Sequence, residues 1–297
     1  MAPGPASPRP AFDAAPVVLI AAFAAGPWAA ALLFVLAGFG AMPPATLPWT
    51  VVVLLGALLA APAARAAALL PPRRALGLTA AGVALAVATA LAAALPPAYL
   101  ATLPVALATF DLLRRVPELY GTALVYVGAT VLANFTLDSF LPLGDFFLVN
   151  VGTLFFGITF TQRDRLHRSG RGVVYRVILA AALANVVAAW SLGTPWRYVA
   201  VSFLAIVIAE TADTEVYQRL LHRPWFARVA GSNAVSAPLD TVVFTVLAFA
   251  GAPFATAAWM TQVIVTDVLV KYGASLVAAI TVLSNPAWVP KAPDPSA

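Results

Sequence analysis

Long runs of apolar residues limit most strongly how this chain can fold. Several of them extend for about 20 residues, the length that an α-helix needs to cross the hydrocarbon core of a bilayer. Charged residues make up 10% of the 297 residues, against roughly 25% in soluble domains, and the mean hydropathy is +0.92. A transmembrane β-barrel would show short alternating strands instead. The sequence therefore predicts an all-α integral membrane protein, a polytopic helical bundle.

The number of spans follows from the arginines. Apolar segments cover residues 16–39, 48–69, 75–95, 97–113, 118–137, 143–161, 173–192, 197–218, 233–250 and 257–283. Segment 97–113 decides between nine and ten spans, because it is short and contains Pro104 and Asp111. Cytoplasmic loops are enriched in Lys and Arg, and the four arginine clusters fall on one side only if this segment crosses. We therefore predict about ten transmembrane helices in the cytoplasmic (inner) membrane, with both termini cytoplasmic.

The chain divides by its content of polar residues. Residues 1–15 and 286–297 are predicted to be cytoplasmic tails, the first of them disordered. A signal peptide is the alternative at the start, but segment 16–39 exceeds the signal core of about 7–15 residues, so we expect an uncleaved helix. Residues 16–115 are predicted to form four accessory helices, and residues 16–110 to have no ionisable group inside a span. Residues 116–285 hold almost all the polar groups and are predicted to form a six-helix transporter core.

Composition also excludes several kinds of chemistry. The chain has no cysteine, and both of its histidines lie in arginine-rich segments, so neither a metal site nor a cofactor is predicted. The net charge of +5 is typical of cytoplasmic loops and does not indicate nucleic-acid binding.

The stretch VIAETADTEVYQR places carboxylates at the end of an apolar segment. At 100° per residue, Glu210, Asp213 and Tyr217 share one helix face, whereas Glu215 points elsewhere and is expected to lie at the interface, near Arg219. A carboxylate at the bilayer centre costs roughly 2.5–3.5 kcal/mol or more. Glu210 and Asp213 are therefore candidate substrate-binding residues. The alternative is an ion pair or hydrogen bond that holds two helices together.

The following segment, SNAVSAPLDTVVF, carries a second polar face formed by Asn233, Ser236, Asp240 and Phe244. Pro238 is expected to break or kink the helix and to free carbonyls there, with a simple packing kink as the alternative. Because Asp240 lies eight residues beyond Ser232, we expect it at the depth of Glu210 and facing Asp213. Two such carboxylates would share a proton.

The last segment contains TDVLVKY, in which Asp267 and Lys271 are four residues apart. This spacing favours an ion pair, and a contact with substrate is the alternative. Asp164, in TFTQRDRLHR, is expected to be a solvated or loop-bracing carboxylate and is a candidate gating or coupling residue.

Together these motifs resemble a known family. ETADTEVYQRL, SNAVSAPLDTVVFTVLAFAG and WMTQVIVTDVLVKYGASL are similar to the C-terminal half of the queuosine precursor transporters, a vitamin-uptake-transporter-like family, and FFGITFTQRDRL resembles an earlier helix of that family. The resemblance covers residues 118–283. It implies a six-helix importer of 7-deazaguanines such as 7-cyano-7-deazaguanine, with Asp213, Asp240, Asp267 and Lys271 as its buried polar core. The chain departs from the family in Arg168, where many relatives carry glutamate, and in residues 1–115.

The resemblance implies a membrane transporter for a purine-like small molecule. A carboxylate can accept from the donor edge of such a base, and Tyr217 or Phe244 can stack on its ring. Two other interpretations stay open: the membrane subunit of an ATP-driven vitamin uptake system, whose ATPase would be a separate partner, and an intramembrane aspartyl enzyme. The sequence contains neither a GxxxxGK[ST] motif nor a GxGD motif. A homo-oligomer is compatible with all three interpretations.

Overall fold

The computed structural model describes residues 14–36, 49–137, 139–192 and 195–283. Residues 1–13 and 286–297 of the predicted tails, and the loop over residues 40–47, lie outside this description. The helices are α1 Ala15–Ala24, α2 Gly26–Leu36, α3 Trp49–Ala68, α4 Pro72–Ala92, α5 Thr102–Leu113, α6 Glu118–Phe135, α7 Val151–Leu166, α8 Arg171–Leu192, α9 Trp196–Arg219, α10 Trp225–Phe249 and α11 Ala257–Leu283. Short 3-10 helices cover Pro97–Ala101 and His167–Ser169, and two strands, β1 Phe140–Leu143 and β2 Phe147–Asn150, form an antiparallel hairpin.

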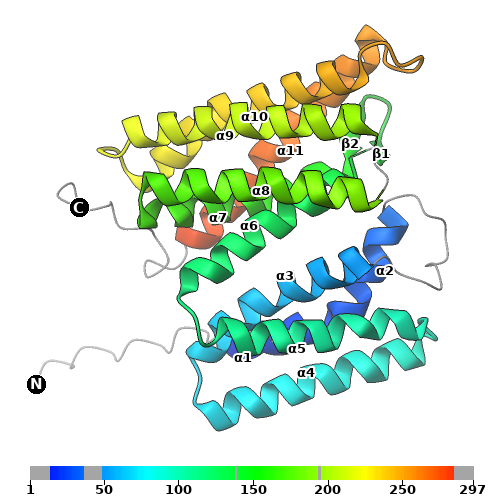
Figure 1. The fold of residues 1–297 in the computed structure, drawn as a ribbon, viewed down its shortest axis with the longest axis vertical. Coiled ribbons are helices and arrows are strands. Elements are labelled where there is room, and N and C mark those ends of the chain that lie inside the picture. The colour runs from blue at the N-terminus through cyan, green and yellow to red at the C-terminus, as the bar shows by residue number, and fades with distance from the viewer. Residues whose placement is uncertain (1–13, 37–48, 138, 193–194, 284–297) are drawn as a thin grey trace, which may run out of the picture.

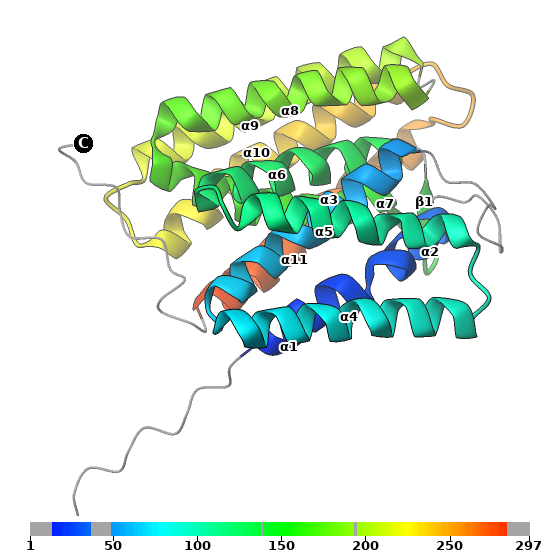
Figure 2. The same ribbon diagram turned by 60° about the horizontal axis from the view of Figure 1, so that its bottom comes forward.

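The helices form two groups that lie side by side (Figure 1). We call α1–α5 the accessory helices and α6–α11 the core helices. In the views of Figures 1 and 2, α4 lies on the far side of the accessory helices from α8 and α9, and α3 packs against α6 where the groups meet. The accessory helices pack largely through alanine and leucine, with Phe23 and Phe110 in edge-to-face contact at 5.4 Å.

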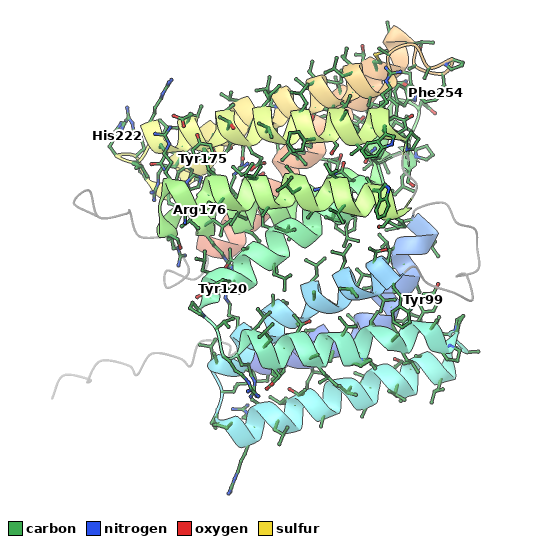
Figure 3. All side chains as sticks on the ribbon, in the orientation of Figure 1. Tyr99, Tyr120, Tyr175, Arg176, His222 and Phe254 are labelled. Carbon is green, nitrogen blue, oxygen red and sulfur yellow. The ribbon has the colours of Figure 1, made fainter. Side chains whose placement is uncertain are left out.

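The two ends of the bundle differ in charge. The connections α3–α4, α5–α6, α7–α8 and α9–α10 lie at one end, which we call the arginine-rich end, and His222 and Phe254 mark the two ends in Figure 3. At the opposite end, Arg197 donates hydrogen bonds to the carbonyls of Leu247 and Ala250 and so caps α10. This placement agrees with the distribution that the positive-inside rule requires.

The first apolar segment is bent. The predicted helix over 16–39 is two helices, α1 and α2, at 56° to one another. Pro27 explains the break, because its ring removes one backbone donor and clashes with the preceding turn. Segment 97–113 likewise starts as a 3-10 helix and continues as α5.

Within the described residues, four helices are long and apolar enough to cross a membrane by themselves: α3, α4, α8 and α10. The bent pair α1–α2 makes a fifth if it is one span. This number is below the ten that the arginine pattern predicts. Polar groups are one reason, since α9 contains Glu210, Asp213 and Glu215 within its second half. The fold is thus all-α and of a membrane type, apart from one hairpin.

Two predicted boundaries in the core are wrong. The segment 143–161 does not start as a helix: the hairpin β1–β2 occupies residues 140–150 and α7 begins at Val151, where Asn150 caps it by accepting from the Gly152 N–H at 2.8 Å. The helix predicted from residue 233 begins at Trp225 instead, and it runs past Pro238 to Phe249 without interruption. Pro238 therefore does not break α10, although it still leaves one carbonyl without its helical donor.

Candidate functional site

A small cavity lies among the core helices. It has a volume of about 40 Å³, enough for two or three water molecules. Side chains from α6, α7, α9, α10 and α11 line it, and the polar ones are Asn134, Asn150, Thr153, Ser202, Asp240, Thr241, Thr245, Asp267 and Lys271. Five helices thus direct polar groups into one space. Burying these groups costs free energy unless they pair with one another or bind a ligand.

A buried ion pair between α10 and α11 forms one wall of this cavity. Lys271 Nζ donates to Asp240 Oδ2 at 2.6 Å and to the Thr241 hydroxyl at 2.8 Å. The Lys271 side chain is 3% exposed and that of Asp240 13% exposed. Asp240 on the neighbouring helix thus offers Lys271 a carboxylate at hydrogen-bonding distance, and the i,i+4 ion pair between Asp267 and Lys271 stays a prediction.

Asp267 of α11 holds the β1–β2 hairpin against that helix. Its Oδ1 accepts from the backbone N–H of Asn150 at 3.3 Å, and the Thr266 hydroxyl accepts from the Leu148 N–H at 3.1 Å. Asp267 is buried and also lines the cavity. Sequence analysis did not predict the hairpin, and so could not predict this contact.

A second polar cluster centres on Arg163 of α7, which is completely buried. Its guanidinium lies 3.0 Å from Glu210 Oε1 and 2.9 Å from Asp213 Oδ2, and it donates to Asn233 Oδ1 at 2.8 Å. The Ser236 hydroxyl donates to Asp213 Oδ1 at 2.8 Å. We call these five residues the Arg163 cluster. It ties α7, α9 and α10 together between the cavity and the arginine-rich end.

The cavity and the Arg163 cluster lie at different depths. At a rise of 1.5 Å per residue, Asp240 is about 22 Å from Trp225 at the start of α10, whereas Asp213 is about 9 Å from the end of α9. The prediction that Asp240 lies level with Glu210 and faces Asp213 is wrong, because α10 starts eight residues earlier than expected. Each carboxylate has its own cation, so the contacts do not support a shared proton.

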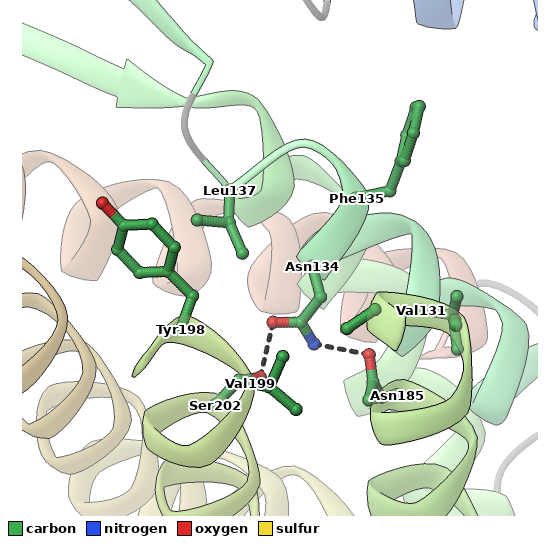
Figure 4. A pocket seen from close by; sticks show the side chains of 10 residues that line it. Val131, Asn134, Phe135, Leu137, Asn185, Tyr198, Val199 and Ser202 are labelled. Atoms are coloured by element: carbon green, nitrogen blue, oxygen red, sulfur yellow. Dashed lines mark hydrogen bonds between the residues drawn. The ribbon is translucent and has the colours of Figure 1, made fainter. Parts of the chain in front are cut away.

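A second, smaller cavity adjoins the first (Figure 4). It measures about 20 Å³ and shares Asn134, Leu137 and Ser202 with the larger one. The Asn134 amide donates to Asn185 at 2.7 Å and accepts from the Ser202 hydroxyl. One asparagine thereby links α6, α8 and α9 at the cavity wall.

Tyr217, Phe244, Asp164 and Glu215 complete the predicted residues. Phe244 lines the cavity, but Tyr217 does not: its ring stacks on His167 at 4.1 Å, with the Arg228 guanidinium 5.4 Å from its centre. Tyr217 therefore cannot stack on a ligand in this conformation. The side chain of Asp164 lies outside the described part of the chain. Glu215 pairs with Arg171 and accepts a hydrogen bond from Tyr175, and its interfacial position stays a prediction.

Sequence analysis missed Arg163 as a site residue. It stands in the run RDRLHRSGR and was counted with the loop arginines, whereas α7 continues past it to Leu166. Charge balance could have identified it, because two carboxylates buried on one face of α9 require a nearby cation. No cluster of three His, Asp or Glu side chains able to hold a metal ion occurs in the described ranges.

The fold and the site together define a class of protein: a multi-pass helical membrane protein with a charged cavity among its core helices. Residues 150–284 match the model of a family described as "Putative vitamin uptake transporter". The match covers Asn150, the last residue of β2, and α7–α11, which carry the cavity's charged residues and the whole Arg163 cluster. No curated protein and no solved structure shows significant similarity to the chain.

Proposed function

We propose that this protein is a transporter that imports a queuosine precursor, a 7-deazaguanine such as 7-cyano-7-deazaguanine, or a similar purine-like molecule. The observation that carries the proposal is the cavity with Asp240, Lys271 and Asp267 in its wall, inside a region that matches a vitamin uptake transporter family. Intramembrane ionisable groups that face a protein interior commonly mark substrate or ion pathways.

The chemistry of the cavity suits such a ligand. A deazaguanine presents a ring N–H and an exocyclic amine on one edge, beside a carbonyl. The Asp240 carboxylate can accept from both donors, and Lys271 or a hydroxyl of Thr241 can donate to the carbonyl. Phe244 offers a ring from the same helix. A site that pairs polar edges rejects analogues that leave those groups unpaired.

Binding requires a larger cavity. Ligand pockets measure about 300–1,000 Å³, far more than the cavity's volume of about 40 Å³, so this conformation has no room for the substrate. In this proposal the Arg163 cluster closes the route to the arginine-rich end, and the hairpin with Phe140, Phe249 and Trp259 closes the other end. In alternating access, the Arg163 cluster and the hairpin closure would open one at a time, so that the cavity faces one side of the membrane and then the other.

Residues Glu210, Asp213, Asn233 and Ser236 take a different role in this proposal from the one expected at first. Glu210, Asp213 and Asn233 hold Arg163, and Ser236 donates to Asp213. None of the four lines the cavity. They act in gating, on the side where we place the cytoplasm. No contact gives specific support to a binding subunit of an ATP-driven uptake system. An intramembrane aspartyl enzyme gains none either, because Asp213 and Asp240 pair with separate cations.

Uptake of labelled 7-cyano-7-deazaguanine tests the proposal. Cells that can neither make nor import the compound should accumulate it when they express this chain. Unlabelled deazaguanines should compete, and a purine lacking the exocyclic amine should compete poorly. Accumulation equal to that of cells without the chain would refute the proposed substrate. Accumulation only with a co-expressed ATPase would favour the binding-subunit alternative.

A further inference from the structure

A large crevice separates the accessory helices from the core helices. Its volume is about 960 Å³, and α3, α6, α7 and the connection between α5 and α6 form most of its wall. It is distinct from the cavity of the core, since the two share no lining residue. Small residues leave this space open, among them Ala61, Ala64 and Ala68 of α3 and Gly121 of α6.

The crevice is polar at one end and apolar along the rest. At the arginine-rich end, Arg65, Arg114, Arg115, Arg165, Glu118 and Gln162 surround its mouth. Leu55, Leu58, Leu132 and Phe155 line its deeper part. Leu55 lies about 15 Å from Arg65 along α3.

The mouth of the crevice has more arginines than carboxylates, even when every ion pair there is counted. Arg65 pairs with Glu118, and Arg114 and Arg115 share the single carboxylate of Asp111, at 2.8 and 2.6 Å. Among the side chains that the structure describes, four arginines thus face two carboxylates. The Arg115 side chain remains largely exposed, at 71%, so an anionic group can reach its guanidinium.

We propose that the crevice binds one anionic phospholipid, with its phosphate at the mouth and its acyl chains along the apolar wall. A molecule with an anionic head and apolar chains matches both the charge and the length of the crevice. Basic pockets between transmembrane helices bind anionic head groups in this way. The lipid would fill the interface between the two helix groups and stabilise their association. The proposal is independent of the transported substrate.

Native mass spectrometry of the full chain in detergent tests the proposal, with phosphatidylglycerol and phosphatidylcholine as probes. We expect phosphatidylglycerol to bind at one saturable site, more tightly than phosphatidylcholine. The double variant Arg115→Gln/Arg165→Gln should weaken it by roughly 30-fold, at about fivefold for each arginine. The matched control Arg219→Gln/Arg223→Gln carries the same charge change at the same end, away from the crevice, and should leave affinity unchanged.

Two further variants make the test independent of folding defects. Glu118→Gln removes a competing negative charge and should tighten phosphatidylglycerol binding about fivefold, a gain that misfolding cannot produce. Gly121→Phe should block the crevice, and its first side-chain atom has room, with Leu113 Cδ2 nearest at 3.9 Å.

Three results would overturn the proposal. The first is equal binding of the two lipids, and the second is equal loss in the Arg115→Gln/Arg165→Gln variant and its control. The third is a dimer that covers the crevice and forms without regard to lipid.

Discussion

Arg163 shows how a single buried cation can organise three helices. It is fully buried, and its partners Glu210 and Asp213 are 8% and 0% exposed in their side chains. A buried charge of this kind contributes little net stability when paired, but it is strongly destabilising when a partner is lost. The cluster is thus suited to a closure that stays shut until all its contacts change together.

We expect Arg163→Gln to lower the free energy of unfolding by about 3–5 kcal/mol, because it leaves two carboxylates buried without a cation. Thermal unfolding of the purified protein in detergent measures the loss. Arg176→Gln, at an exposed position of α8, is the control and should change stability by less than about 0.5 kcal/mol. A variant with Arg163, Glu210 and Asp213 all made neutral should recover much of the loss; no recovery would contradict this account of the cluster.

His167 makes stability depend on pH. It lies in the α7–α8 connection, is 2% exposed and has its Nδ1 3.2 Å from the Gln218 amide nitrogen. Burial, with Arg163 and Arg228 nearby, lowers the pKa of His167 from 6.5 to about 3. The unfolded chain therefore binds a proton below pH 6.5 that the folded chain refuses. Stability from this group is complete above pH 6.5 and is lost as the pH falls towards 3.

The measurement is unfolding between pH 7 and 5, for wild type and His167→Gln. We expect the wild type to lose up to about 1.4 kcal/mol more per pH unit below 6.5 than the variant does. Parallel pH profiles for the two proteins would show that His167 is protonated in the folded state as readily as in the unfolded state.

At the scale of helices, the sequence predicted where polar groups enter the membrane but not how they pair. Glu210, Asp213, Asp240 and Lys271 were identifiable because charges are rare in apolar segments. Their partners were not, since one-dimensional spacing describes only contacts within a helix. The start of α10 was misplaced because Trp225–Gly231 contains Arg228 and resembles a loop, although Arg228 is buried against Tyr217.

The hairpin was missed for a related reason. Leu141–Val149 is apolar except for Asp145 and continuous with the following helix, so hydropathy does not separate them. Its two strands pair only with each other, and side chains of α11 hold β2. Those contacts come from residues more than 100 positions away, which no local pattern reveals.

The close approach of α6 and α7 allows a test at this scale. A Cβ at Gly152 would lie 2.3 Å from the Ala133 carbonyl oxygen, so the helices must separate in Gly152→Ala. We expect a loss of about 1–3 kcal/mol, as for other overpacked positions. Gly77→Ala is the matched control, because nothing lies within 4 Å of its new atom, and alanine there should gain up to about 1 kcal/mol. Equal thermal stability of the two variants would contradict this packing.

The whole molecule combines accessory helices and core helices, and the topology proposed for it has ten spans. Besides α3, α4, α8, α10 and the bent pair α1–α2, five more helices must then cross the membrane, with their polar faces covered by neighbours: α5, α6, α7, α9 and α11. The family match begins at residue 150, and so supports the transporter assignment for α7–α11. The division of the chain at residue 115 stays a prediction.

Site-specific reporters test the topology. Under the ten-span arrangement, reporters at residues 72, 116, 169 and 226 should all read cytoplasmic, because the connections between these helices lie at the arginine-rich end. A reporter at residue 142, in β1, should read the opposite side. If 72 and 116 report opposite sides, residues 97–113 do not cross and the ten-span count is wrong.

The central claim is that the cavity beside Asp240 is the substrate site, and uptake by an Asp240→Asn variant tests it most directly. The change preserves the shape of the side chain but replaces a carboxylate, which has two acceptor oxygens, with an amide. It also removes the negative charge that Asp240 offers to Lys271. One charge-assisted hydrogen bond lost is about 1.5–3 kcal/mol, or roughly 10–150-fold in affinity for labelled 7-cyano-7-deazaguanine. Glu215→Gln, whose contacts with Arg171 and Tyr175 lie outside the cavity, should transport like the wild type. Wild-type affinity in a correctly inserted Asp240→Asn protein would contradict the claim and leave Asp240 as a residue that only joins α10 to α11.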